Sequence, residues 1–219
     1  MLFANIDEII DGKEDPTTNE NSIRTTSDEK LADNRIRDFM RKEKTMEVTM
    51  TDWPTKRDWF ECYRRALHTE GKVATKPPTD AWKRKALRAR HSMIRRLWFT
   101  FDFKCPYWVS VHLVRHHEGV QFYVSSQRND RQSEYDRNAA RQDAPVRVIC
   151  DINAEALINM ANKRLCMKAA EETRGLVREM CMLAAAECPE IKDELVPMCK
   201  RNGGVCYEMK PCGRADGGT

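Results

Sequence analysis

Residues 151–188 read DINAEALINMANKRLCMKAAEETRGLVREMCMLAAAEC and contain no proline and only one glycine, Gly175. Apolar residues recur along this stretch at intervals of three to five, the spacing that gathers side chains on one face of an α-helix. Pro189 follows directly, and proline cannot continue a helix. The pattern predicts a long C-terminal helical region that begins after a cap at Asp151 and divides into two helices near 163–168.

Shorter elements are predicted upstream of this helical region. Alternating and aromatic runs indicate strands, whereas apolar residues at helical spacing indicate helices. The sequence predicts, in chain order, a strand over 47–51, a helix from Thr55 to Leu67 with Thr55 as its N-cap, a basic helix over 80–91, a strand over 97–103, an apolar helix or strand over 108–115, an undecided segment over 119–125 and a solvated loop or short helix over 127–143.

The length and charge of the chain indicate one ordinary domain. It has 219 residues, 41% of them hydrophobic, and its 38 basic and 34 acidic residues leave a net charge of only +4. This balance makes nucleic acid an unlikely partner, because non-specific binding to it depends on many phosphate contacts. Residues 1–45 are polar and are expected to form an arm, either loosely packed or with a short helix near 30–42. The catalytic or binding domain is expected over 46–219.

The sequence also suggests a location for the protein. It has no apolar run long enough to span a membrane, and residues 1–8 lack the basic start and apolar centre of a signal peptide. We therefore expect a cytoplasmic protein whose nine cysteines are reduced thiols or metal ligands. Cys199, Cys206 and Cys212 offer a structural zinc site as an alternative, although they lack the usual Cys-x-x-Cys pairing.

Arginine and histidine are concentrated in the middle of the chain. Four of the five histidines lie between His91 and His117. The arginines in and around this segment are Arg88, Arg90, Arg95, Arg96, Arg115, Arg128 and Arg131. Arginine is costly to bury unless it meets an anion, and its planar fork suits phosphate. The segment therefore predicts either a pocket for a phosphorylated ligand or a solvated basic face. A metal site at His112, His116 and His117 is a weaker alternative, since adjacent histidines chelate poorly.

The order of these residues resembles the flavin-dependent thymidylate synthases. That family has a His-x-Ser/Thr element ahead of a Phe-Thr-Phe strand, then Arg-His-Arg, seven residues and Ser-x-Arg. The chain has His91-Ser92, Phe99-Thr100-Phe101, Arg115-His116-His117 and a following Ser125-Ser126-Gln127-Arg128. One inserted residue aligns Ser126 and Arg128 with the family pattern, whereas without it Ser125 matches and Gln127 occupies the arginine position.

The second half of the chain adds to the resemblance. The family's Ala-Arg-x-x-x-Pro element matches Ala140 to Pro145, and its two helix asparagines and following arginine match Asn153, Asn159 and Arg164. A glutamate eight residues beyond that arginine is Glu172, and the cysteine-rich tail resembles the tail of some members. The ordered matches extend over residues 90–213.

The resemblance implies both a fold and a reaction. The expected fold is α/β (α+β), an antiparallel or mixed sheet flanked by helices. The expected reaction is methylation of a pyrimidine deoxynucleotide, dUMP to dTMP, with FAD as cofactor and with methylenetetrahydrofolate and NADPH as cosubstrates. The family's sites lie between the subunits of a homotetramer, and no membrane is involved.

The resemblance also assigns roles to residues. The expected flavin contacts are Ser92, Arg115, His116, His117, Asn153 and Asn159. The expected nucleotide contacts are His112, Ser125, Ser126, Arg128, Arg141 and Arg164. Arg164 is the predicted catalytic residue, because a uracil ring becomes electrophilic at C6 when a cation lies near its carbonyl, and arginine keeps its charge at any ordinary pH.

Four departures from the family lie within the predicted site. His117 replaces arginine, Arg95-Arg96 replaces Glu-His, Phe122-Tyr123 replaces Asn-Glu, and Glu155 replaces the arginine beside the first helix asparagine. Arg95 and Glu155 suggest a charge exchange between neighbours. The departures leave two alternatives open: an enzyme that acts on another pyrimidine nucleotide, and a nucleotide-binding protein without catalysis.

Overall fold

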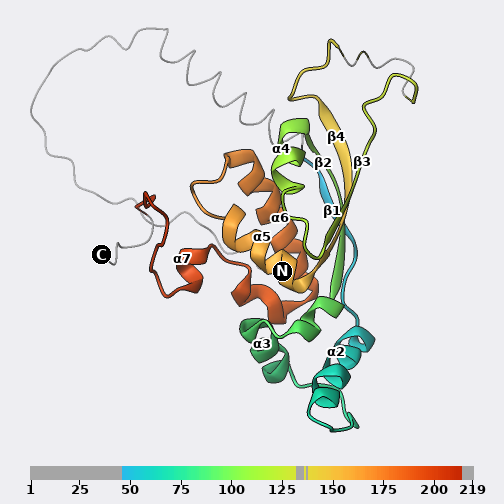
Figure 1. The fold of residues 1–219 in the computed structure, drawn as a ribbon, viewed down its shortest axis with the longest axis vertical. Helices are drawn as coiled ribbons and strands as arrows, with labels where there is room; N and C mark the ends of the chain where they lie inside the picture. The colour runs from blue at the N-terminus through green and yellow to red at the C-terminus, as the bar shows by residue number, and fades with distance from the viewer. Residues whose placement is uncertain (1–45, 132–135, 137, 214–219) are drawn as a thin grey trace, which may run out of the picture. The chain divides into compact units, whose positions relative to one another are not determined.

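The computed structural model describes residues 46–131, 136 and 138–213, all of which belong to one unit spanning residues 40–219. The predicted arm over 1–45, including its helix near 30–42, lies outside the described residues, so the domain boundary stays a prediction. The elements along the described chain (Figure 1) are β1 (Val48–Asp52), α2 (Lys56–Thr69), α3 (Asp80–Ala89), η1 (Ser92–Arg96), β2 (Trp98–Pro106), α4 (Tyr107–Leu113), β3 (Val120–Val124), β4 (Pro145–Asn153), α5 (Ala154–Arg164), α6 (Glu171–Glu187), η2 (Pro189–Glu194) and α7 (Met198–Arg201).

Four antiparallel strands form the sheet in the order β1-β2-β4-β3. Alternate residues of β2 point to one face, where Phe99, Phe101 and Phe103 are buried. This follows from the two-residue period of a strand, which places every second side chain on the same face. The predicted strands over 47–51 and 97–103 and the predicted fold class are therefore confirmed.

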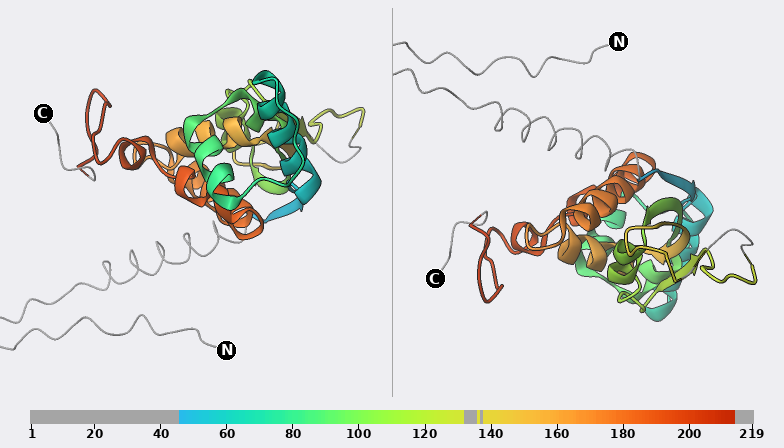
Figure 2. Two further views of the ribbon diagram at one scale, coloured as in Figure 1. Left: turned by 90° about the horizontal axis from the view of Figure 1, so that it is seen from below. Right: turned by 90° about the horizontal axis from the view of Figure 1, so that it is seen from above.

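Helices cover the buried face of the sheet (Figures 1 and 2). Helix α4 packs against β2 and β4, α5 against β4, and α6 against β1 and β2. Fully buried Leu157 and Met160 on α5 and Leu176 on α6 belong to the same core as the phenylalanines of β2. Burying one such side chain contributes roughly 1.5–3 kcal/mol, so this layer of helices holds α5 firmly against the sheet.

The N-terminal boundary of the C-terminal helical region differs from the prediction. Strand β4 occupies 145–153, because Val146, Val148, Cys150 and Ile152 alternate with exposed or half-buried residues. The expected cap at Asp151 is therefore wrong: Asp151 lies in the strand, and its carboxylate accepts a hydrogen bond of 2.7 Å from the Thr100 hydroxyl. Asn153 caps α5 instead, since its side-chain oxygen accepts from the backbone N–H of Ala156.

Other predicted boundaries are confirmed. The division near 163–168 lies between α5, which ends at Arg164, and α6, which begins at Glu171. Thr55 caps α2 in a reciprocal capping box with Asp58. The segment over 108–115 is helical, and the undecided segment over 119–125 contains strand β3.

The described chain contains no helix that is both long and apolar enough to cross a membrane. All nine cysteines are free thiols. Nowhere among residues 46–131, 136 and 138–213 do three His, Cys, Asp or Glu side chains gather in a way that could hold a metal ion.

Candidate functional site

Arg164 and His116 meet where the C-terminus of α5 lies beside the turn that follows α4. Arg164 is the last residue of α5 and is half-buried. Its Nε donates to Nε2 of His116 over 3.1 Å, and its Nη2 donates to the carbonyl oxygen of His112 over 2.7 Å. These two contacts fix the guanidinium plane, so one predicted nucleotide contact is held by two other predicted site residues.

The electrostatics of this pair favour a neutral imidazole next to a permanent cation. Burial, followed by the charges of Arg164 and His117, lowers the pKa of His116 to about 4. His116 is therefore neutral near pH 7 and accepts the Arg164 hydrogen bond at Nε2, which places the ring proton on Nδ1. Burial and the charge of Arg115 lower the pKa of Arg164, but arginine still keeps its proton.

No carboxylate within the described chain forms an ion pair with Arg164 or Arg115. The listing of ion pairs among described residues includes many other arginines, such as Arg95 and Arg147, each within 4 Å of an acid. Two neighbouring cations without an acid create a positive potential at the end of α5. Such a place can bind an anion or polarise a carbonyl oxygen.

His112 and His117 flank the pair. Nδ1 of His112 lies 3.0 Å from the hydroxyl of Thr173, and its ring meets the edge of Trp108 with centroids 5.3 Å apart. Nδ1 of His117 lies 3.2 Å from the carbonyl oxygen of Arg115, to which its N–H donates in the matching tautomer. His112 is therefore held in place by α6, whereas the exposed ring of His117 is fixed only by its own turn.

Asn153 and Gly119 join this turn to the start of α5. The backbone N–H of Asn153 donates to the Gly119 carbonyl over 2.9 Å. Gly119 has a φ of +71°, and a Cβ added to it would lie 2.3 Å from Nδ2 of Asn153. Only glycine meets both conditions without strain. The predicted flavin contact Asn153 therefore also caps α5 and supports the turn that carries Arg115, His116 and His117.

Arg90 grips the middle of α5, a contact that sequence reasoning missed. Its guanidinium donates to Oδ1 of Asn159 and, over 2.5 Å, to Oδ1 of Asn162. Arg90 has a φ of +53°, which is rare for a residue with a side chain, and its buried Nε has no hydrogen-bond partner among the described residues. Because Arg90 occupies the oxygen of Asn159, the amide N–H₂ of Asn159 is left to donate elsewhere.

Asn162 links the same cluster to η2 and the segment after it. Its Nδ2 donates to the carbonyl oxygens of Val196 and Glu194, over 2.6 and 3.3 Å. The only sequence signal for this role was the three-residue spacing from Asn159, which places both side chains on one face of a helix.

Ser92 opens η1, and this segment packs against both α5 and β4. Three residues further on, Arg95 forms an ion pair with Glu155 at 2.5 Å. The two residues at which the charges depart from the family pattern are therefore neighbours, as a charge exchange requires.

Ser125, Arg128 and Arg141 lie at the other end of the sheet. The backbone N–H and carbonyl of Arg147 pair with Oγ and N of Ser125, over 3.1 and 2.8 Å, and Ser126 follows. Arg128 pairs with Asp130 at 2.6 Å and Arg141 with Asp143 at 2.9 Å. Val120 pairs with Ile152 beside the α5 cap, whereas Ser125 lies five residues along the strand, or roughly 17 Å away. One chain thus separates the predicted nucleotide contacts into two groups.

Comparisons with known proteins show a likeness of fold. No protein-family model matches the chain, and no curated protein matches it. A solved structure of thymidylate synthase X (ThyX) from Helicobacter pylori, with FAD and dUMP, is similar with a TM-score of 0.57 and 13% identity, over 69% of this chain and 99% of that one. The UMP/dUMP methylase PolB from Streptomyces cacaoi, bound with 5-Br dUMP, is similar with a TM-score of 0.55 and 15% identity, over 68% of this chain and 94% of that one.

Proposed function

We propose that this chain is a flavin-dependent pyrimidine-nucleotide methylase that converts dUMP to dTMP, with methylenetetrahydrofolate as carbon donor and NADPH as reductant. The observation that carries the proposal is the half-buried Arg164, which has no acid partner among the described residues and is held by neutral His116 and the His112 carbonyl. The likeness of fold to a ThyX with FAD and dUMP and to a UMP/dUMP methylase supports it.

The residues around α5 suit FAD, which carries a diphosphate and a ring rich in hydrogen-bond acceptors. Arg115 supplies an uncompensated charge for the diphosphate, together with His117. Asn159 has a free amide N–H₂ because Arg90 takes its oxygen. Ser92, His116 and Asn153 complete the proposed flavin contacts. When bound, the reduced flavin supplies the hydride of the methylation, and the protein supplies binding, orientation and charge.

Arg164 has the proposed catalytic role of polarising the nucleobase. Its position at the end of α5 is fixed by two hydrogen bonds, so little reorganisation is needed when a carbonyl oxygen of the ring arrives. Neutral His116 accepts a proton from Arg164 in a hydrogen bond without cancelling its charge. The cation therefore stays available to withdraw electrons from the ring and make C6 electrophilic.

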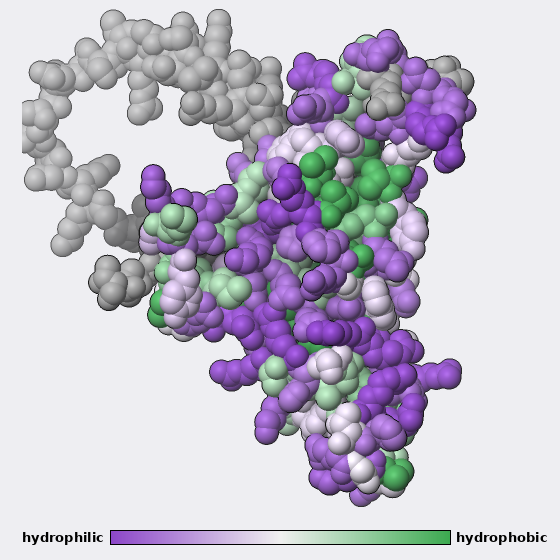
Figure 3. All heavy atoms as spheres, in the orientation of Figure 1, coloured by the Kyte–Doolittle hydropathy of each residue, from purple (hydrophilic) through white to green (hydrophobic). Residues whose placement is uncertain are grey.

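A homotetramer with sites between subunits is part of the proposal. It would let Ser125, Ser126, Arg128 and Arg141 of one copy join Arg164 of another, which one chain does not do. The surface near α4 and the neighbouring strands is rich in apolar side chains (Figure 3), among them exposed Val114, Val124 and Ile149. An exposed apolar patch of this kind is typical of protein interfaces.

The first experiment is the absorbance spectrum of the purified protein. We expect a yellow protein with an oxidised-flavin band, or a colourless one that gains this band when FAD is added and free FAD is removed. A protein that takes up no flavin contradicts the flavoprotein proposal.

The second experiment separates the substrates. Methylation at C5 displaces the hydrogen there, so tritium should be released from C5-labelled dUMP in the presence of methylenetetrahydrofolate and NADPH. PolB is described as acting on both UMP and dUMP, which favours C5-labelled UMP as the comparison substrate. Release from UMP alone would move the substrate to the ribonucleotide. Nucleotide binding without any release would indicate a binding protein without catalysis.

A further inference from the structure

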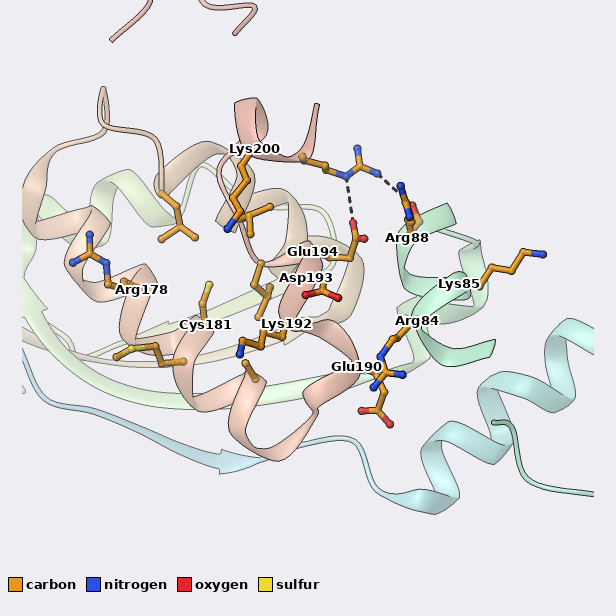
Figure 4. A pocket seen from close by; sticks show the side chains of 16 residues that line it. Arg84, Lys85, Arg88, Arg178, Cys181, Glu190, Lys192, Asp193, Glu194 and Lys200 are labelled. Carbon is orange, nitrogen blue, oxygen red and sulfur yellow. Dashed lines mark hydrogen bonds and ion pairs between the residues drawn. The ribbon is translucent and has the colours of Figure 1, made fainter. Parts of the chain in front are cut away.

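A groove of about 1010 Å³ lies between helix α3, helix α6, η2 and α7 (Figure 4). It belongs to neither group of proposed substrate contacts, although Leu165 at its edge follows Arg164 directly. Pockets for small ligands have volumes of roughly 300–1,000 Å³, so this groove reaches the upper end of that range. A ligand that fills it is larger than a single phosphate group.

The rim of the groove carries positive charge that the described chain does not neutralise. Five basic side chains of the rim form no ion pair there: Arg84, Arg88, Arg178, Lys192 and Lys200. A sixth, Lys85, points away from the centre (Figure 4). The positive charge is spread over four elements, which suits a ligand with several separated negative charges.

The acids of the groove are largely neutralised already. Glu194 pairs with Arg201 at 3.3 Å, and Glu190 pairs with Lys83 at 2.5 Å. Asp193 is the remaining acid of the lining. The unpaired cations therefore outnumber the unpaired acid, and the groove attracts anions.

The floor of the groove is apolar and contains no aromatic ring. Buried Cys181 and Leu195 and half-buried Val196 form part of it. Single-stranded nucleic acid is usually held by bases that stack on aromatic side chains, and none of the described lining residues offers one. An apolar floor between separated cations instead matches carboxylates that alternate with aliphatic side chains.

We propose that this groove is a docking site for an acidic peptide segment of a partner protein, in which apolar residues lie between glutamates or aspartates. The carboxylates meet the cations of α3, α6, η2 and α7, and the apolar side chains cover Cys181, Leu195 and Val196. This function is separate from the proposed methylation.

Fluorescence anisotropy with the full chain tests the proposal. The probes are a labelled short peptide of Glu-Glu-Leu repeats, a glutamate-only peptide of equal length and a single-stranded DNA of equal charge. We expect the leucine-containing peptide to bind most tightly and to dissociate as salt is raised, because its charges are partly solvent-exposed. No flavin or nucleotide is present, so the result does not depend on the proposed methylation.

Paired variants locate the site. Reversing two rim charges with Arg178→Glu and Lys192→Glu should weaken peptide binding roughly tenfold or more. The neutral pair Arg178→Gln and Lys192→Gln should act in the same direction and guards against misfolding of the reversed variant. The matched control is Lys56→Glu with Lys76→Glu, two exposed lysines outside the groove, which should leave binding unchanged.

Several results would overturn the proposal. They are an absence of binding, an equal loss in the control pair, equal affinity for the glutamate-only peptide, and tighter binding of the DNA. The last of these would identify the groove as a nucleic-acid site instead.

Discussion

Arg164 donates a hydrogen bond of 3.1 Å from Nε to Nε2 of His116, and the two side chains hold one another in place across α5 and the turn after α4. The contact requires a neutral imidazole, because a doubly protonated ring has no acceptor and would repel the guanidinium. The protonation of His116 is therefore coupled to the geometry of the proposed catalytic arginine.

This coupling predicts that acid destabilises the fold through His116. The pKa of His116 is about 4 in the folded chain and near its ordinary value of 6.5 when unfolded. Between these values the unfolded chain takes up a proton that the folded chain refuses, so the contribution is complete above pH 6.5 and is lost as the pH falls toward 4. We expect a loss of about 1–2 kcal/mol, reduced by solvent because the ring is half-buried.

Urea unfolding at a series of pH values measures this loss. The His116→Gln variant should show a flatter pH dependence between pH 6.5 and 4, whereas His68→Gln, at an exposed histidine of α2, should keep the wild-type dependence. Equal pH dependence of wild type and His116→Gln would contradict the prediction.

A second prediction concerns the removal of the cation. Arg164→Ala should weaken binding of dUMP by roughly tenfold to a hundredfold, the range expected for loss of a charged hydrogen bond, while flavin stays bound. The pKa of His116 should rise, because the charge of Arg164 is one cause of its low value. Calorimetry with dUMP, the flavin absorbance and an NMR titration of the histidines measure the three effects.

The neighbouring variant Lys163→Ala is the control, since Lys163 is exposed on the same turn of α5. It should leave all three measurements near wild type. Loss of flavin from Arg164→Ala would show that the division of roles between flavin and nucleotide contacts is wrong.

Local signals in the sequence were sufficient for several elements and for one charge exchange. The aromatic alternation of β2 and the capping box of Thr55 and Asp58 depend on neighbouring residues, so they are legible without the fold. Strand β4 was missed because it runs into α5 without a loop, and Asn153 serves both elements. Here the strand period of two passes directly into a helical pattern, and the sequence alone favoured the helix.

The contacts of the site were harder to predict because they join distant parts of the chain. Arg90 and Asn159 are 69 residues apart, and Arg164 and His116 are 48 apart. The resemblance selected Arg164, His116 and Asn159 individually, but it gave no reason for Arg90 to adopt a positive φ and hold α5. The roles of Arg128 and Arg141 stay predictions, since both pair with local aspartates in the single chain.

Gly119 provides a third prediction with a matched control. Gly119→Ala should destabilise the chain by more than Gly71→Ala, although both glycines have a φ of +71°. The shared backbone strain costs roughly 1 kcal/mol, and the clash with Asn153 is added only at Gly119, because nothing lies within 4 Å of a Cβ at Gly71. Urea unfolding of both variants gives the difference. Equal losses would show that Asn153 moves away freely and does not support the turn.

The Arg95–Glu155 ion pair gives a fourth prediction about the charge exchange. Arg95→Glu places two carboxylates together and Glu155→Arg places two guanidiniums together, so each single variant should lower the urea midpoint. The double variant restores an opposite-charge pair in the reversed order and should recover most of the loss. Its recovery measures the coupling of the two residues. Additive losses in the double variant would indicate that the two positions do not interact.

The last prediction tests whether two copies build one site. Arg164 lies at one end of the sheet and Arg141 at the other, so a site that uses both needs them from different copies. Arg164→Ala and Arg141→Ala should each abolish tritium release from dUMP. After unfolding and refolding as an equal mixture, half of the copies supply an intact Arg164 and half an intact Arg141. A site drawn from two copies is then intact in about one quarter of cases, so about a quarter of wild-type activity should return. If one copy supplied both arginines, every site in the mixture would carry one defect, and mixing would restore nothing. Refolded wild type sets the reference for this measurement, and each variant refolded alone sets its background.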